Sequence, residues 1–183
     1  MCIRDSIVID PGAAFGHGAH PTTRMTIEMM LKYLTPANAS NTTVVDLGTG
    51  TGVAAIIAAR LGARVRAIEI DPVALEVAWF NVERNSGYPF DDVHRLIELQ
   101  KGDAANATIE TSDLVLVNVT LDVHRQIAKQ ASNAREVIAS GILHHQIEKL
   151  QDLYFGHEPI TLTTSGEWAA VNFSKTDHMG RKN

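Results

Sequence analysis

The chain has 183 residues, a formal net charge of −5 and a single cysteine. This length predicts one domain, which buries roughly 70% of the surface of the unfolded chain. The acidic balance argues against nucleic acid as a direct partner, because neutralising phosphates requires a basic face. No apolar run is long enough for a membrane span. Cys2 has no partner for an internal disulfide, which indicates a reducing, cytoplasmic compartment.

The opening residues, MCIRDS (1–6), lack the apolar core of a signal peptide, and we treat them as a leader of non-native origin without a structural role. After them, short β-rich apolar runs alternate with segments of helical spacing. In chain order, the predicted elements are a helix at 23–34, a strand at 42–47, a helix at 53–63, a strand at 64–70, a helix at 71–85, strands at 96–100 and 113–119, a helix at 121–132, a strand at 136–142 and a helix at 144–155.

The tail, 159–174, contains two further β-like runs around Ser165-Gly166, which predicts a closing hairpin. Asp71 is the expected N-cap of the helix at 71–85, with Pro72 at its first position. Alternating strands and helices indicate an α/β fold with a mostly parallel sheet covered on both faces. The hairpin adds two antiparallel strands at one edge and brings the total to seven.

The first predicted strand is followed by DLGTGTG, which contains Asp46, Gly48, Gly50 and Gly52. In an open α/β sheet, ligands bind beyond the carboxyl ends of the strands, where the strand order reverses. Glycines there let backbone N–H groups at a helix start approach a bound group. Dinucleotide folds prefer G-x-G-x-x-G, but Val53 occupies the third position here. The spacing favours an adenosine with an amino-acid tail over a nicotinamide cofactor.

Polar residues also follow the next three strands. Glu69 lies about 20 residues after Gly48, the offset at which an acidic side chain meets the hydroxyls of a ribose. Asp103 either accepts a hydrogen bond from an adenine amino group or only forms a turn. Asn118 offers one acceptor and two donors, which suits an amine or the amino-acid end of a cofactor, or else it caps the following turn.

Parallel packing brings these four strand ends to one edge of the sheet. Their convergence predicts a site for S-adenosylmethionine. Two structural interpretations compete with it, namely a glycine-rich turn that binds nothing and a solvated Glu69.

Several stretches resemble PrmA, the family of bacterial methyltransferases that modify a large-subunit ribosomal protein. They are PGAAFGHGAHPTT (11–23), VVDLGTGTGVAAIIAARLGA (44–63), AIEIDPVALEVAWFNVERN (67–85), VNVTL (117–121), SGIL (140–143) and EWAAVNFSK (167–175). The resemblance extends from about residue 8 to residue 175, and the AFGxGxHPTT stretch is its specific part. It implies the Rossmann-like fold of class I S-adenosylmethionine-dependent methyltransferases and methylation of a lysine or N-terminal amine of the ribosomal protein.

In enzymes of this kind the loop before the first helix folds over the cofactor. The resemblance implies cofactor contacts at Thr23, Gly48, Glu69 and Asn118. Together with the residues suggested by their strand-end positions, the expected cofactor site comprises Thr23, Asp46, Gly48, Gly50, Gly52, Glu69, Asp103 and Asn118. No metal is expected.

Methyl transfer is an in-line displacement from a sulfonium, so the enzyme mainly positions the nucleophile and excludes water. A lysine must lose its proton first, and desolvation in an apolar pocket lowers its pKa. We therefore expect Asn118 to orient the amine, while Phe15 and the loop around His17 and His20 enclose it. His20 either accepts the proton or packs within the loop, and we favour packing.

This chain departs from the family pattern at three positions near the site. His17 stands where the family usually has Thr, Glu69 where it has Asp, and NVTL (118–121) where it has NILA. Glu for Asp keeps the ribose-binding chemistry, whereas the change after Asn118 affects the acceptor. The family also carries an N-terminal domain that recruits the ribosomal substrate, which we expect to be absent from this chain.

Two alternatives stay open. The domain methylates another protein or a small molecule, or it is a non-catalytic fragment that only binds the cofactor. Three further aromatic residues are expected to be mainly structural. Trp79 and Phe80 cover the sheet, and Trp168 either borders the acceptor site or packs in the core, of which we favour packing. His144 and His145 point about 100° apart on a helix, which disfavours joint metal ligation.

Overall fold

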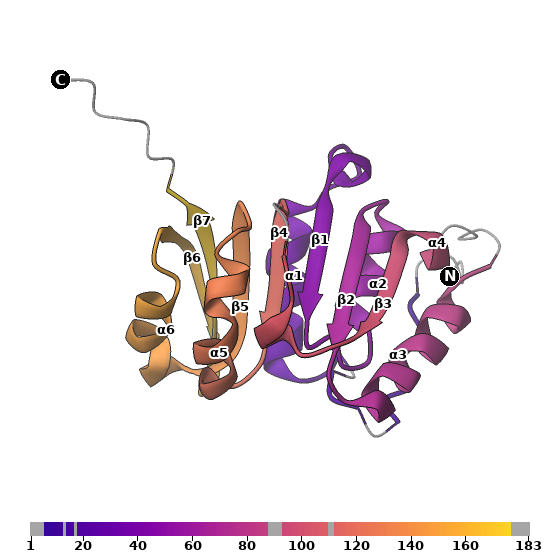
Figure 1. Ribbon diagram of the computed structural model, residues 1–183, viewed down its shortest axis with the longest axis horizontal. Helices are drawn as coiled ribbons and strands as arrows, with labels where there is room; N and C mark the ends of the chain where they lie inside the picture. The colour runs from indigo at the N-terminus through magenta and orange to yellow at the C-terminus, as the bar shows by residue number, and fades with distance from the viewer. Residues whose placement is uncertain (1–5, 13, 17, 88–92, 110–111, 177–183) are drawn as a thin grey trace.

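The computed structural model describes residues 6–12, 14–16, 18–87, 93–109 and 112–176. Its sheet has seven strands in the order β3-β2-β1-β4-β5-β7-β6 (Figure 1). The strands are β1 (Thr43–Leu47), β2 (Arg64–Glu69), β3 (Ile97–Lys101), β4 (Leu114–Asn118), β5 (Glu136–Leu143), β6 (His157–Ser165) and β7 (Trp168–Lys175). β1 to β5 pair in parallel, and β7 is antiparallel to both β5 and β6. The predicted seven-stranded α/β sheet with its closing hairpin is confirmed.

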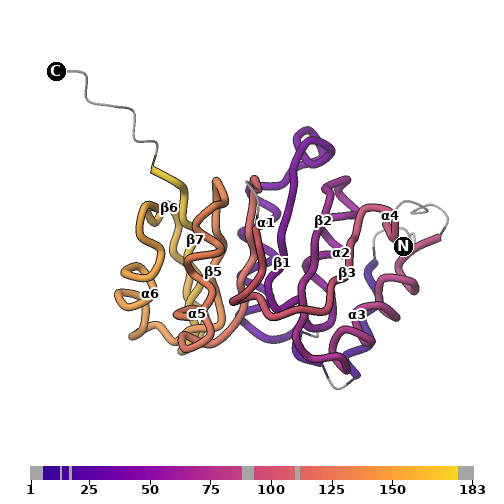
Figure 2. Tube along the Cα trace, viewed as in Figure 1, coloured from indigo at the N-terminus to yellow at the C-terminus, as the bar shows by residue number. Residues whose placement is uncertain are grey.

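Helices cover both faces of this sheet (Figures 1 and 2). The helices are α1 (Pro21–Tyr33), α2 (Val53–Arg60), α3 (Pro72–Asn85), α4 (Val93–Leu96), α5 (Leu121–Ala131) and α6 (Ile147–Leu153), with short 3-10 turns at Ala39–Asn41, Ala104–Asn106 and His144–Gln146. α1, α2 and α3 pack on one face, and α5 and α6 pack on the other. Within the described ranges, no helix is long and apolar enough to cross a membrane.

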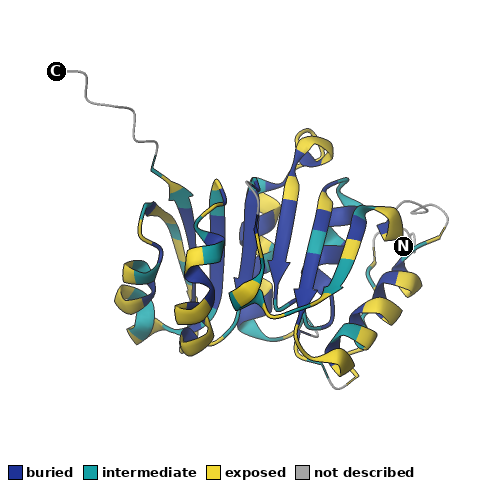
Figure 3. Cartoon of the chain, in the orientation of Figure 1, coloured by how far each residue is buried: buried dark blue, intermediate teal, exposed yellow. Residues whose placement is uncertain are grey.

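Successive side chains of the central strands enter opposite layers of the core. Val44 of β1 packs with α1 and α2, whereas Val45 packs with α5 and α6. Both layers are apolar because a parallel strand is buried on both faces. Figure 3 shows this continuous burial along the central strands, with exposed residues on the outer surfaces of the helices. The double layer keeps the strand ends at fixed relative positions.

The helix boundaries follow local capping chemistry. α1 begins at Pro21, two residues before the predicted start, because His20 caps it and Pro suits the first helical turn. Asp71 caps α3 as predicted, accepting a hydrogen bond from the Val73 N–H. α2 ends at Arg60, earlier than predicted, and Gly62 follows with a φ of +107°.

Two boundaries near the carboxyl terminus also differ from expectation. The predicted helix at 144–155 begins with a 3-10 turn, and its α-helical part is shorter, Ile147–Leu153. β6 begins at His157 rather than at residue 159. Short 3-10 turns at helix ends and shifts of about two residues at element boundaries are usual.

The prediction that Trp79 and Phe80 cover the sheet is wrong. Trp79 is 51% exposed and Phe80 is 55% exposed, and their rings lie edge to face on each other with centroids 5.1 Å apart. The inner face of α3 is instead formed by smaller side chains, among them Ala78 and Val82. Helical periodicity then turns the two aromatic residues outward.

Candidate cofactor site at the carboxyl edge of the sheet

A cavity of about 680 Å³ lies at the carboxyl ends of the parallel strands. Its lining includes Gly48 and Gly50 after β1, Glu69 at the end of β2, Asp103 after β3 and Asn118 at the end of β4. The predicted convergence of these strand ends is confirmed. β1 and β4 are neighbours, and the strand order reverses between them, which is where open α/β sheets bind ligands.

The glycine turn after β1 has three residues in the left-handed region. The φ angles are +75° at Gly48, +56° at Gly50 and +79° at Gly52, a region that L side chains rarely adopt. A Cβ on Gly50 would lie 2.3 Å from the carbonyl oxygen of Phe15. Gly52 is the N-cap residue of α2, faces Ala78 of α3 and is outside the lining of the cavity. Its conformation serves helix packing.

The backbone N–H groups of this turn, residues 48–52, all donate hydrogen bonds within the protein. Gly48 and Thr49 donate to the carbonyl of Ile68, Thr51 donates to Phe15, and Gly52 donates to Thr49. The Gly50 N–H donates to the Glu69 carboxylate. We expected backbone N–H groups of this turn to approach a bound group, but they all donate within the protein and are not available to a bound anion. The arrangement suits a ligand without a pyrophosphate.

Glu69 is buried and held by three backbone donors. Its Oε2 accepts from Gly50 N–H at 2.9 Å, and its Oε1 accepts from Ile70 and Asp71 at 3.0 and 3.1 Å. A carboxylate has about four acceptor sites, so these bonds leave about one for a donor from a ligand. The side chain lies in the cavity lining with its orientation already set.

Asp46 lies beneath the glycine turn and is 5% exposed. Burial raises the pKa of its carboxyl to about 6; the hydrogen bond from the Thr49 hydroxyl, 2.7 Å long, opposes this rise, and the charge of Glu69 adds to it. Asp46 is absent from the lining of the large cavity but lines a smaller one of about 30 Å³, together with Thr23 and Asn118.

Asn118 joins the two cavities, since it lines both. Its side-chain N–H donates to the Thr23 hydroxyl across 3.3 Å. Its Oδ1 is buried and has no hydrogen-bond partner among the described residues. A buried acceptor without a donor is costly, which marks a position where a ligand N–H would be stabilising.

Phe15, His20 and Trp168 form an aromatic wall on one side of the large cavity. The His20 ring lies between the other two, with centroid distances of 5.2 Å to Phe15 and 4.9 Å to Trp168. His20 also caps α1: its Nδ1 accepts from the Thr22 N–H at 3.4 Å and lies 2.8 Å from the Thr22 hydroxyl oxygen. This capping role agrees with the packing interpretation of His20.

Trp168 meets both of its expected interpretations. It is partly buried and packs against the core, and it also lines the cavity. The cause is the antiparallel pairing of β7, in which Trp168 stands opposite Leu143. The amino end of β7 therefore lies at the same edge as the carboxyl end of β5, a register that sequence patterns do not reveal.

Asp103 forms a turn, one of the two roles expected for it. Its Oδ1 accepts from the Ala105 N–H at 2.9 Å, and its Oδ2 accepts from the Asn106 side chain at 2.8 Å. It is exposed and still lies in the cavity lining, so the turn and a ligand contact are compatible. His17 and Cys2 lie outside the described residues.

Gly141 belongs to the site and was missed by the sequence analysis. It lines the cavity with a φ of +86°, at a register shift between Ser140 and Ile142 of β5. A Cβ there would lie 2.4 Å from the Val119 carbonyl oxygen. An isolated glycine within a strand pattern is the signal that indicates such a bulge or close approach.

The sheet order and this cavity define a protein with the class I S-adenosylmethionine-dependent methyltransferase fold. The same fold occurs in an RNA methyltransferase from Salinibacter ruber, solved in complex with S-adenosyl-L-homocysteine, with a TM-score of 0.66 and 20% identity over 89% of this chain and 98% of that one. Residues 4–176 match the family described as "Ribosomal protein L11 methyltransferase (PrmA)", and the chain belongs to this family.

Two relatives illustrate the membership. The chain is 36% identical over 172 residues to the ribosomal protein L11 methyltransferase of Alkaliphilus oremlandii, which covers 90% of this chain and 52% of the relative. The crystal structure of a ribosomal protein L11 methylase from Lactobacillus delbrueckii subsp. bulgaricus has a TM-score of 0.71 and 29% identity, over 92% of this chain and 84% of that one. The chain spans about half the length of the curated relatives that it matches.

Proposed function

We propose that the chain is the catalytic domain of an S-adenosylmethionine-dependent methyltransferase that modifies amino groups of ribosomal protein L11. The observation that carries the proposal is the meeting of Glu69, the glycine turn and the unpartnered Oδ1 of Asn118 at one cavity, in a member of the PrmA family. We place the reaction in the cytoplasm, with L11 as partner and without direct binding of nucleic acid.

The residues present fit the cofactor. The volume of about 680 Å³ is within the range of small-molecule sites. Glu69 keeps an acceptor site for a ribose hydroxyl. The N–H groups of residues 48–52 are all used within the protein and none is left for a pyrophosphate, a group that S-adenosylmethionine does not contain. Thr23, Asp46 and Asp103 lie around the same two cavities and complete the proposed contacts.

When bound, the cofactor supplies an electrophilic methyl group on a sulfonium, which passes to the lone pair of an amine. Asn118 would orient that amine, because its buried Oδ1 is free to accept an N–H from the acceptor. The aromatic wall would exclude water from the amine, and this desolvation favours the neutral, nucleophilic form. His20 takes part by packing and by capping α1.

Binding and transfer should be measured separately. Calorimetry with S-adenosylhomocysteine tests the cofactor site, and radiolabelled methyl transfer to purified L11 tests the acceptor, with a full-length relative as positive control. We expect both. Methylation of another protein or a metabolite in place of L11 would overturn the acceptor assignment. Binding without transfer to any acceptor would contradict the catalytic proposal, and absence of binding would contradict the whole of it.

A further inference from the structure

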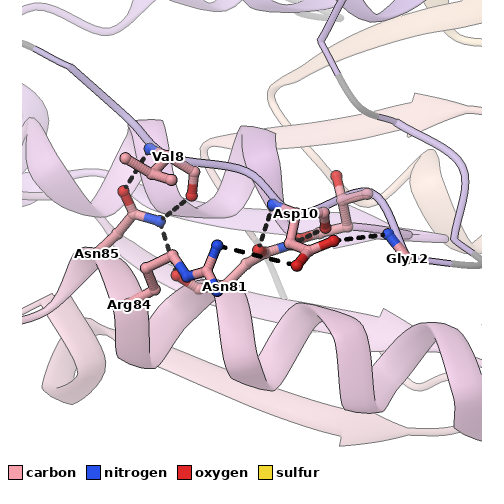
Figure 4. Close-up of polar contacts among 7 residues, drawn as sticks. Val8, Asp10, Gly12, Asn81, Arg84 and Asn85 are labelled. Carbon is pink, nitrogen blue, oxygen red and sulfur yellow. Dashed lines mark hydrogen bonds and ion pairs between the residues drawn. The ribbon is translucent and has the colours of Figure 1, made fainter.

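Asn81 and Asn85, one turn apart on α3, bind the extended segment from Val8 to Asp10 (Figure 4). This segment leads into the loop that carries Phe15 and Gly16, called the Phe15 loop below. Asn85 accepts from the Val8 N–H at 3.0 Å and donates to the Val8 carbonyl at 2.7 Å. Asn81 does the same with Asp10, at 2.9 Å for both bonds. Each side-chain amide thus makes the two backbone hydrogen bonds that a neighbouring strand would make to this residue in a sheet.

The spacing of this clamp follows from the geometry of helices and strands. Residues four apart on a helix are separated by about 6 Å along its axis. Alternate residues of an extended chain are separated by about 6.6 Å. Asn81 and Asn85 therefore stand in register with Asp10 and Val8. Both asparagines are buried, with exposed fractions of 0% and 3%.

Asn81 makes one contact that Asn85 lacks. Its side-chain N–H also donates to the carbonyl of Thr51, at 3.0 Å, within the glycine turn. Thr51 in turn holds the loop: its N–H donates to the Phe15 carbonyl at 3.0 Å, and its hydroxyl donates to the Gly16 carbonyl at 2.6 Å. A continuous series of hydrogen bonds therefore connects Asp10 to the loop that carries Phe15.

We infer that Asn81 is a positioning residue, which fixes the Phe15 loop over the cavity by joining the incoming segment to the glycine turn. Asn81 does not line the cavity and acts through Thr51. Without its amide, Thr51 keeps its bonds to the loop, but the turn and the incoming segment are no longer held together. The loop then samples more positions, and the cavity loses one wall for part of the time.

Asn85 provides a matched control, since it has the same residue type, helix, burial and two-bond clamp. Its third bond, from the side-chain N–H to the Asn81 carbonyl at 2.7 Å, stays within α3 and does not reach the glycine turn. Asn81→Ala is expected to weaken binding of S-adenosylhomocysteine about tenfold, as it would if the loop were in its binding position only about a tenth of the time. It should also speed amide exchange at Thr51. Asn85→Ala should lower the melting temperature to a similar degree, with the dissociation constant and Thr51 exchange near the wild-type values.

The inference rests on the proposed function only for the binding measurement. If the wild-type chain does not bind S-adenosylhomocysteine, the proposed function fails, whereas Thr51 exchange still tests the coupling. If Asn81→Ala does not fold, Thr51→Val replaces it, because it removes the hydroxyl bond to Gly16 and should loosen the loop with Asn81 intact. Equal effects of the two asparagine variants on binding and exchange, or normal loop exchange in Asn81→Ala, would overturn the inference. Where Asn81→Ala does not fold, normal loop exchange in Thr51→Val would overturn it.

Discussion

The side-chain nitrogen of Asn118 lies 3.3 Å from the hydroxyl oxygen of Thr23, although 95 residues separate them in the chain. The contact joins the carboxyl end of β4 to the first turn of α1. This hydrogen bond uses one N–H of the Asn118 amide. The Oδ1 of the same amide is buried and has no hydrogen-bond partner in the described part of the chain. The Oδ1 of Asn118 is therefore left to accept a hydrogen bond from a bound ligand, since no described protein group donates to it.

Asn118→Ala should lower the rate of methyl transfer by at least about 100-fold, comparable to the loss of one positioned polar group in other active sites. Affinity for S-adenosylhomocysteine should fall but stay measurable, because Glu69 and the glycine turn are unchanged. Single-turnover kinetics and calorimetry would separate the two effects. Asn133→Ala, at an exposed position whose side chain donates to Ile109, serves as the control. Unchanged turnover in Asn118→Ala would remove this residue from the mechanism.

Gly50→Ala should both destabilise the protein and weaken cofactor binding, because the new Cβ would meet the Phe15 carbonyl at 2.3 Å. Gly166→Ala is a matched control: its φ of +59° is close to the +56° of Gly50, but no atom lies within 4 Å of its Cβ. We expect the control to lose about 1 kcal/mol from backbone strain alone and to bind normally. Urea unfolding and calorimetry test this, and equal behaviour of the two variants would contradict the prediction.

Asp46→Asn should change the pH dependence of stability. Burial raises the pKa of Asp46 to about 6 in the folded state, above the ordinary 3.8 of the unfolded chain. The folded state therefore binds the proton more tightly, and the stability that this contributes is complete below pH 3.8 and is lost as the pH rises through 6. The shift of about two units corresponds to about 3 kcal/mol. Relative to wild type, Asp46→Asn should gain about this much between pH 4 and 7 in urea unfolding; a constant difference would refute the prediction.

His124→Gln should show the opposite trend. His124 is buried, with Nε2 2.8 Å from the Ser140 carbonyl oxygen and Nδ1 2.8 Å from the Tyr154 hydroxyl. A carbonyl only accepts, so Nε2 carries the proton and Nδ1 accepts from Tyr154. Burial lowers the pKa of His124 to about 4, so the stability that its neutral form contributes is present above pH 6.5 and is lost as the pH falls toward 4.

This histidine effect, about 3 kcal/mol, opposes that of Asp46 over nearly the same pH range. Between pH 7 and pH 4, the free energy of unfolding of His124→Gln should therefore rise by about 3 kcal/mol relative to that of wild type. Parallel curves for wild type and variant would indicate that His124 titrates alike in the folded and unfolded states.

Local patterns were sufficient for much of the fold and of the site. Strand ends, the Asp71 cap and the glycine turn were all predicted, because they depend on residue spacing and on backbone conformations that only certain residues adopt. Glu69 and Asn118 were found for the same reason, as polar residues at the ends of apolar strands. Trp79 and Phe80 were placed wrongly, because periodicity shows that a helix has two faces but not which one meets the sheet.

The sequence by itself thus determined the order of the elements, the edge of the sheet that holds the site and the class of ligand that suits it, since each follows from neighbours along the chain. Only the tertiary structure decided that Trp168 borders the cavity, that Gly141 admits Val119 and that Asn81 joins Asp10 to Thr51. These contacts depend on antiparallel register and on helix rotation. Both are set by packing between segments that lie far apart in sequence.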